Sequence, residues 1–176
     1  METVPDLTLG AVRIITFPMI QTGARLPLDF TLKVLQANDE KEVKFGELLT
    51  RRTVVSVYMR NNTGGCDKQN DSLVGYAAKL DRAGYNLIAV SRDSLASHRK
   101  YAAKKGITYV LASDPDDRFA RATDSLVEKS MYGRTFIGPA RAAYVLDRDG
   151  TVLAVIEKVT PSEHAAQLAA SIATLR

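Results

Sequence analysis

The feature of this sequence that most restricts its fold is a regular alternation of short apolar runs with helix-type segments in the middle of the chain. Runs such as "RTVVSVY" and "YNLIAVS" leave little room for a solvated face, which is typical of strands buried on both sides. We expect strands at residues 53–59, 85–91 and 107–114. Because a helical segment follows each run, the chain is predicted to adopt an α/β fold with parallel strands at its centre.

Capping signals mark the ends of the intervening helices. We expect these helices at residues 66–82, 93–106 and 115–126. Gly84 and Gly106 are suited to end the first two, since glycine adopts the left-handed conformation that follows many helices. Asp93 and Ser94 are candidate N-caps of the second helix, and Pro115 is expected in the first turn of the third. In "SDPDD", residues 113–117, ordinary capping explains the acidic residues.

The flanking segments predict antiparallel elements. A strand pair is expected around residues 30–45. Residues 141–159 form two apolar runs around Asp-Arg-Asp-Gly, in which Gly150 supplies the positive φ of a tight hairpin turn. A final helix is expected at residues 161–175. Parallel units followed by an antiparallel pair predict a mixed, twisted sheet with helices on both faces.

Length and composition indicate one ordinary domain. The 176 residues are read as a domain at 29–176 preceded by an extension at 1–28, which carries the strand-like "AVRIITF" and is expected to pack on the domain. No stretch reaches the roughly 18 apolar residues of a membrane span, and Arg13 interrupts the apolar N-terminal part, so we expect neither membrane insertion nor a secretory signal. The net charge of +4 is modest, and the basic residues are spread along the chain, so the sequence does not indicate nucleic acid or membrane binding. A reducing cytoplasm is the predicted location.

The one cysteine of the chain, Cys66, stands where a buried strand turns into a helix. Sites in open α/β sheets collect at the carboxyl ends of strands, where helices begin. There the unpaired N–H groups and the helix dipole favour a thiolate over a thiol, so the pKa of the cysteine falls and the sulfur becomes a nucleophile. Gly64 and Gly65 would let a substrate approach the backbone, and Thr63 would bring its hydroxyl over the same pocket.

A purely structural interpretation of the same residues stays open on spacing alone. In it, Thr63 is only an N-cap, the two glycines form only a turn, and Cys66 is a small buried hydrophobe, as free cysteines often are.

Several blocks beyond the cysteine carry a family resemblance. "TGGC" after a buried strand, with "VSRDSLASHRKYAAKKG", "SDPDDRFARA", "EKSMYGRTFIG" and "RAAYVLDRDG" in the same order, resembles the peroxiredoxin family, and within it the bacterioferritin comigratory protein or Q-type branch. The resemblance runs from about Asp29 to the C-terminus. It implies a thioredoxin-like fold that carries a thiol-dependent peroxidase, with no metal and no other cofactor.

The resemblance also implies the roles of individual residues. Cys66 falls on the peroxidatic cysteine, Thr63 on the threonine of the "PxxxTxxC" loop, and Arg141 on the arginine set against the thiolate. Arginine stays charged and donates in a fixed fork, while threonine both donates and accepts, so the two can hold a peroxide. The backbone N–H of Gly65 is a further candidate donor. Met59 takes the position of the loop's proline and is the second candidate substrate-binding residue.

The sequence departs from the family pattern around the cysteine. Besides Met59 for proline, the proline of "TPGC" is replaced by Gly64, and the charged positions nearby hold Asn61, Asn62 and Gln69. Asp71 stands where a resolving cysteine is often found. Without a second cysteine, the sulfenic acid must be reduced by an external thiol, either a small thiol or a thioredoxin- or glutaredoxin-like protein. We therefore expect a one-cysteine peroxidase that reduces hydrogen peroxide and small organic hydroperoxides.

Two other functions are compatible with the same residues. The protein could be a peroxiredoxin-like redox sensor or binding protein without efficient turnover, which the changes at Met59 and Gly64 favour. A thiol transferase is a further alternative, although the absent Cys-x-x-Cys argues against general disulfide reduction. The sequence leaves monomer and homodimer open.

Five further residues are expected to be structural or to lie near the site. His98 and His164 are expected to be exposed on separate helices, without metal-ligand spacing. Arg134 is expected near the site or on the surface. Tyr58 and Phe119 are expected in the core.

Overall fold

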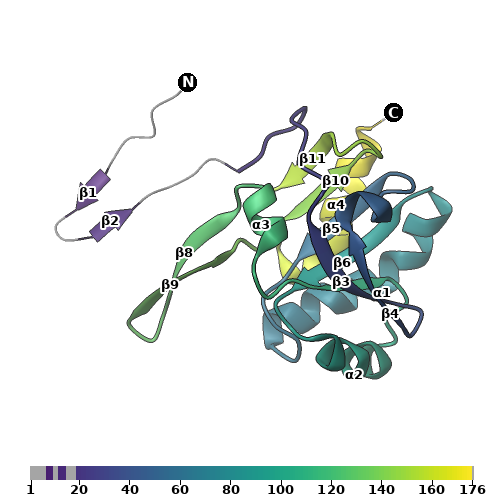
Figure 1. Cartoon of the computed structure of the whole chain (residues 1–176), viewed down its shortest axis with the longest axis horizontal. Helices are drawn as coiled ribbons and strands as arrows, with labels where there is room; N and C mark the ends of the chain where they lie inside the picture. The colour runs from purple at the N-terminus through teal and green to yellow at the C-terminus, as the bar shows by residue number, and fades with distance from the viewer. Residues whose placement is uncertain (1–6, 10–11, 15–18, 176) are drawn as a thin grey trace.

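A seven-stranded mixed sheet forms the centre of the computed structural model, which describes residues 7–9, 12–14 and 19–175 (Figure 1). The strand order is β11-β10-β5-β6-β7-β3-β4, with β5, β6 and β7 parallel and the outer pairs antiparallel. The strands are β3 (Thr31–Gln36), β4 (Asp39–Lys44), β5 (Thr53–Val57), β6 (Asn86–Ser91), β7 (Val110–Ser113), β10 (Ala143–Leu146) and β11 (Val152–Ile156). This confirms the predicted α/β class with a thioredoxin-like mixed sheet.

Helices cover both faces of the sheet, as predicted. They are α1 (Gly64–Arg82), α2 (Leu95–Lys105), α3 (Arg118–Ala122), α4 (His164–Ala173) and the short 3-10 helices η1 (Phe45–Leu48) and η2 (Pro161–Glu163). Val54 packs with residues of α1 and α4, whereas its neighbour Val55 packs with Phe45 and Phe119 on the other face. Such alternation is what a strand buried on both sides requires. No helix among the described residues is long and apolar enough to cross a membrane.

The helix ends agree with most of the predicted signals. Gly84 and Gly106 have φ angles of 90° and 69°, and the Ser94 hydroxyl accepts from the N–H of Ser97 at 3.2 Å. Helix α1 begins at Gly64, two residues before the predicted start at Cys66. The two glycines therefore belong to the first helical turn rather than to a preceding loop turn.

The predicted place of Pro115 inside a helix is wrong. Helix α3 begins only at Arg118, and Pro115 lies in the turn before it. The carboxylate of Asp114 accepts from the N–H groups of Arg118 and Phe119, at 2.8 and 2.9 Å. The acidic run thus caps a helix, as expected, but the helix starts later because the turn precedes it. Phe119 and Tyr58 are in the core, as predicted.

A separate sheet of two strands was not predicted. Strands β8 (Leu126–Met131) and β9 (Arg134–Pro139) pair antiparallel and project from the body as a hairpin (Figure 1). Tyr132 and Gly133 form its two-residue turn, with φ angles of 52° and 74°. Two runs flanking a residue pair with glycine are the signal that could have revealed this hairpin. Arg134 is exposed on β9.

The N-terminal part contains a short hairpin and a segment attached to the sheet. Strands β1 (Leu7–Leu9) and β2 (Val12–Ile14) pair antiparallel. In the segment 19–28, Leu26 is 2% exposed within the core, and the N–H of Gly23 donates to the carbonyl of Val152 at 2.8 Å. Residues 1–6, 10–11 and 15–18 of the predicted extension lie outside the described residues. The division of the chain at residue 28 stays a prediction.

The expectation of two exposed histidines is wrong, because both are fully buried. His98 faces the sheet from α2: its Nε2 donates to the carbonyl of Ala112 at 3.0 Å and its Nδ1 accepts from the Asn61 amide at 3.1 Å. His164 begins α4 and contacts Ser56 of β5. The many basic residues of α2 indicated a solvated helix, but they do not reveal which helical face His98 occupies.

Candidate active site

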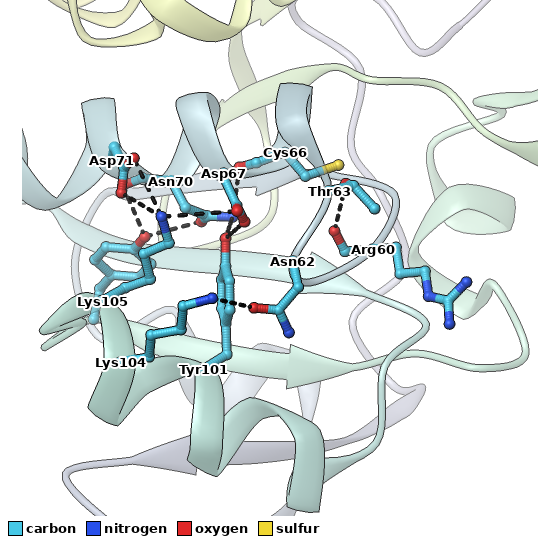
Figure 2. A network of polar contacts seen from close by, with 11 residues as sticks. Arg60, Asn62, Thr63, Cys66, Asp67, Asn70, Asp71, Tyr101, Lys104 and Lys105 are labelled. Carbon is cyan, nitrogen blue, oxygen red and sulfur yellow. Dashed lines mark hydrogen bonds and ion pairs between the residues drawn. The ribbon is translucent and has the colours of Figure 1, made fainter.

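The thiol of Cys66 lies at the carboxyl end of the parallel strands, in the first turn of α1. The chain leaves β5, passes through residues 58–63, and enters the helix at Gly64. Cys66 is a free cysteine and only 1% exposed. Its sulfur points toward Thr63, whereas the neighbouring Asp67 points toward α2 (Figure 2). The predicted place of the cysteine at a strand-to-helix junction is confirmed.

The surroundings of the sulfur favour the thiolate despite its burial. Burial by itself raises the pKa of the Cys66 thiol. Hydrogen bonds from the Thr63 hydroxyl and from the backbone N–H groups of Arg60 and Met59, together with the charge of Arg141, outweigh burial and lower the pKa below its ordinary value. The N–H of Met59 lies 3.4 Å from the sulfur. A merely hydrophobic cysteine would not need these donors.

Thr63 occupies the N-cap position of α1 without acting as a side-chain cap. Its backbone is extended, but its side chain accepts no capping hydrogen bond from the helix. The hydroxyl instead lies within 2.9 Å of the Arg60 carbonyl, to which it can donate (Figure 2). A single hydroxyl hydrogen serves either this carbonyl or the sulfur, while the oxygen stays able to accept. Capping alone therefore does not account for a threonine here.

Arg141 reaches the site from the far end of the chain through the pairing of β10 with β5. Ala143 pairs with Ser56, and the N–H of Val57 donates to the carbonyl of Ala142, which sets Arg141 beside the first turn of α1. A β-carbon at Gly65 would lie 3.5 Å from one terminal nitrogen of the Arg141 guanidinium. The bare backbone of Gly65 thus leaves the space next to the guanidinium open.

Met59 and Lys129 form the side of the site that faces the β8–β9 hairpin. The Met59 backbone donates to Cys66, and the Lys129 ammonium contacts the Met59 thioether. Burial, followed by the charges of Arg141 and Arg92, lowers the pKa of Lys129 to about 8. Lys129 was not predicted as a site residue, since only its position on the unpredicted β8 brings it to the thiol. The block "EKSMYGRTFIG" contained it without indicating its role.

Hydrogen bonds hold the loop that lacks the family's prolines. Asn61 is 4% exposed, and its backbone N–H donates to the Asp93 carboxylate at 2.9 Å. Its side-chain oxygen accepts from the Tyr58 hydroxyl at 2.5 Å, and its amide nitrogen donates to His98. These contacts tie the loop to α2. The hydrogen bonds of Asn61 therefore anchor a loop that lacks the family's prolines at positions 59 and 64.

One lysine and one tyrosine hold the acidic residues near the thiol. The Tyr101 hydroxyl donates to Asp67 at 2.7 Å, and the Lys105 ammonium lies 3.8 Å from Asp67 and 3.1 Å from Asp71 (Figure 2). These partners offset the negative charge that Asp67 places one residue after the cysteine. Asp71, at the position of a resolving cysteine, is thus part of an ion-pair cluster.

The structure brings together all five residues predicted for the site. They are Met59, Thr63, Gly65, Cys66 and Arg141. Among the residues that the structure describes, no cluster of three or more histidine, cysteine or acidic side chains could hold a metal ion. The chemistry available at this place is that of an activated thiol beside a guanidinium.

Comparison with known proteins supports the same chemistry. The sequence matches the AhpC/TSA family over residues 22–155. Peroxiredoxin Bcp of Xanthomonas campestris is 34% identical over 119 residues, which cover 68% of this chain and 74% of that protein. Chloroplastic peroxiredoxin Q of Gentiana triflora is 32% identical over 164 residues, covering 93% and 71%. The solved bacterioferritin comigratory protein of Xanthomonas campestris, described as having alkyl peroxide reduction activity, superposes with a TM-score of 0.78 at 29% identity, covering 89% and 100%.

The thioredoxin-like sheet, the activated thiol and these relatives define a thiol-dependent peroxide reductase. The chain belongs to the AhpC/TSA family, because the family match spans well over half of its residues. Its single cysteine is consistent with a one-cysteine mechanism.

Proposed function

We propose that the Cys66 thiolate attacks one oxygen of hydrogen peroxide or of a small organic hydroperoxide in line with the O–O bond. The S–O bond forms as the O–O bond breaks, so the sulfur is oxidised to sulfenic acid and the peroxide is reduced to water or an alcohol. The leaving oxygen carries the negative charge until it takes up a proton. The observation that supports this proposal best is a buried thiol whose pKa is nevertheless lowered by surrounding donors and by Arg141.

The surrounding groups would act on the peroxide as well as on the thiolate. Because a lower thiol pKa also weakens the nucleophile, acceleration must come from donors that follow the charge onto the leaving oxygen. Arg141 and the first-turn N–H groups of Gly65 and Cys66 are suited to this, since first-turn N–H groups have no partner inside the helix. Thr63 would accept the peroxide hydrogen, and Met59 would border the peroxide through its backbone.

Reduction of the sulfenic acid would require an external thiol. The first thiol displaces water and forms a mixed disulfide with Cys66, and a second thiol then releases the Cys66 thiolate. Because Cys66 is 1% exposed, a protein thiol reaches the sulfur only after the first turn of α1 opens locally. We infer that the reductant is a small thiol or a thioredoxin- or glutaredoxin-like protein, and that the cycle runs in the reducing cytoplasm.

The rate of Cys66 sulfenylation tests this function. We expect hydrogen peroxide at neutral pH to convert Cys66 to sulfenic acid at least about a thousandfold faster than it oxidises a free thiol. The Arg141→Ala variant should have a sulfenylation rate constant about a hundredfold lower than that of the wild type, as when one oxyanion donor is removed. Stopped flow with mass spectrometric trapping measures both. Arg134→Ala, which removes an exposed arginine, is the matched control and should react at the wild-type rate.

The outcomes separate the candidate functions. A wild-type rate equal to that of a free thiol, unchanged in Arg141→Ala, would contradict the peroxidase. Fast sulfenylation that no thiol reductant reverses would favour the redox sensor. Faster reaction with disulfides than with peroxides would favour the thiol transferase.

A further inference from the structure

A chain of buried hydrogen bonds connects Arg141 with the last helix of the protein. Arg141 donates to the side-chain oxygen of Gln69 at 2.7 Å. The Gln69 amide nitrogen donates to the Ser56 hydroxyl at 2.8 Å, and Ser56 lies 2.8 Å from Nε2 of His164. Gln69, Ser56 and His164 are all fully buried. Side chains from α1, β5 and α4 thus form one connected path that ends at the guanidinium of the site.

The partners determine the direction of each hydrogen bond. The Gln69 amide nitrogen has two hydrogens and two acceptors, the Ser56 hydroxyl and the carbonyl of Val57 at 3.1 Å, which leaves its oxygen for Arg141. Ser56 accepts from Gln69 and donates its own hydrogen to Nε2 of His164. In this direction the hydrogen of the neutral ring lies on Nδ1, and the ring interacts with the Gln167 side chain; in the opposite direction, the Ser56 hydrogen would have no acceptor.

The surroundings of His164 keep the ring neutral, as this direction requires. Nδ1 of His164, which carries the ring hydrogen in this tautomer, makes no hydrogen bond of good geometry among the described residues, and Gln167 is the side chain that interacts with the ring. The nearby Gln167 amide is engaged with the Thr160 N–H and the Lys158 carbonyl. Burial and then the positive charge of Arg141 lower the pKa of His164 to about 4, against a smaller opposite effect of Gln167. The ring is therefore neutral at neutral pH, and the Ser56 hydrogen selects the tautomer in which Nε2 accepts.

We propose that His164 is a positioning residue for Arg141 that acts through Ser56 and Gln69. By accepting the Ser56 hydrogen, His164 leaves the Ser56 oxygen as an acceptor and so holds the Gln69 amide with its oxygen toward the guanidinium. Without that acceptor, the Ser56 hydrogen competes with Arg141 for the Gln69 oxygen, while the Val57 carbonyl still holds the amide nitrogen. The hydrogen bond from Arg141 to Gln69 then weakens, and the guanidinium shifts. The inference rests on the proposed peroxidase function, in which Arg141 holds thiolate and peroxide.

The test compares two substitutions of His164. His164→Leu removes the acceptor, and we expect the rate constant of Cys66 sulfenylation to fall about fivefold, the loss of about one hydrogen bond. The pKa of the Cys66 thiol, followed by the ultraviolet absorbance of the thiolate, should rise in the same variant. His164→Gln offers an amide oxygen to Ser56 and should recover the wild-type rate to within about twofold. Thermal unfolding of each variant shows whether it is folded.

Two serine substitutions supply the second measurement if His164→Leu does not fold. Ser56→Ala breaks the path at its middle and should show the same loss of rate and the same rise of thiol pKa. Ser72→Ala is the matched control, because the Ser72 hydroxyl accepts from the N–H of Ala165 and so joins α1 to α4 outside the path.

The outcomes distinguish this inference from the function on which it rests. The inference is supported if sulfenylation is slow in His164→Leu and Ser56→Ala, recovers in His164→Gln and is unchanged in Ser72→Ala. Sulfenylation at the wild-type rate in folded His164→Leu or Ser56→Ala would overturn it. So would a His164→Gln variant that reacts as slowly as His164→Leu. A wild-type protein that reacts no faster than a free thiol would overturn the proposed function, and the inference with it.

Discussion

At the scale of single residues, two opposing effects act on the sulfur of Cys66. Burial disfavours the charged form, whereas the donors around it and the charge of Arg141 favour it, and the second group prevails. The site therefore combines a water-poor environment, in which electrostatic interactions are strong, with a thiolate that is still available at neutral pH. A cysteine at an exposed helix start would have the thiolate without the enclosed surroundings.

Lys129 leads to the first prediction at this scale. Its ammonium attracts the Cys66 thiolate, and its own pKa is about 8. We expect Lys129→Met to raise the pKa of the Cys66 thiol and to slow sulfenylation about threefold near pH 7, because a smaller fraction of thiolate is present. Above pH 8 the wild-type lysine loses its charge, so the two rates should converge. Stopped-flow rates from pH 6 to 9 measure this.

Lys100→Met is the control for Lys129→Met, since it removes one positive charge from the exposed face of α2. Its rates should follow those of the wild type at every pH. A constant ratio between Lys129→Met and wild type across the whole range would contradict an electrostatic role of Lys129.

Single residues also show where sequence reasoning succeeded and failed. The resemblance predicts Cys66, Thr63 and Arg141 as site residues, and the structure places these three residues together. The burial of His98 and His164 was missed, because each histidine has a partner 37 or more residues away in sequence. Spacing within one helix carries no information on such partners.

At the scale of elements, the first turn of α1 is the part of the fold on which the site depends. Gly64 and Gly65 are adjacent but differ in surroundings: a β-carbon at Gly64 would meet nothing within 4 Å, whereas one at Gly65 would touch Arg141. The two glycines therefore serve as a matched pair of positions.

The substitutions Gly65→Ala and Gly64→Ala give a second prediction. Gly65→Ala should keep the fold, since the new contact of 3.5 Å is an ordinary one, but its methyl group excludes peroxide from the guanidinium. We expect its sulfenylation rate to fall about tenfold, a loss of about 1.4 kcal/mol. Gly64→Ala should react at the wild-type rate and unfold at a slightly higher denaturant concentration, because alanine favours the helix over glycine. Equal rates for the two variants would contradict the assignment of Gly65.

The β8–β9 hairpin is the element that sequence reasoning missed. Its strands have six residues each, but β8 carries polar residues such as Glu128 and Lys129 and β9 is largely exposed, so they lack the apolar runs by which the central strands were recognised. Its tip, Tyr132 and Gly133, offers a weaker signal than asparagine with glycine would. With the hairpin, the contact of Lys129 with the site was missed as well.

At the scale of the whole molecule, the buried histidines predict a loss of stability in acid. The pKa of His164 is about 4 in the folded protein and about 6.5 in an unfolded chain, so the unfolded state binds more protons between these values. The free energy of unfolding should therefore fall as the pH falls through this range. His98, whose pKa is also lowered, acts in the same direction.

Urea unfolding at two pH values measures this effect. Between pH 7 and pH 5 we expect His164 to account for about 2 kcal/mol of lost stability, which should be missing in His164→Gln. Carboxyl groups such as Asp114 titrate in both proteins, so their effects cancel in the comparison. The same loss in wild type and His164→Gln would contradict a neutral, buried His164.

Local periodicity and capping in the amino-acid sequence were enough to predict the alternation of strands and helices, the mixed sheet and the position of Cys66 at a helix start. Which distant groups come into contact depends on the packing of the folded chain. Arg141 lies beside Gly65 because β10 pairs with β5, Lys129 reaches Met59 because a hairpin turns back on the body, and His164 meets Ser56 because α4 packs on the sheet. Such contacts follow from strand register and helix packing, which local patterns do not specify.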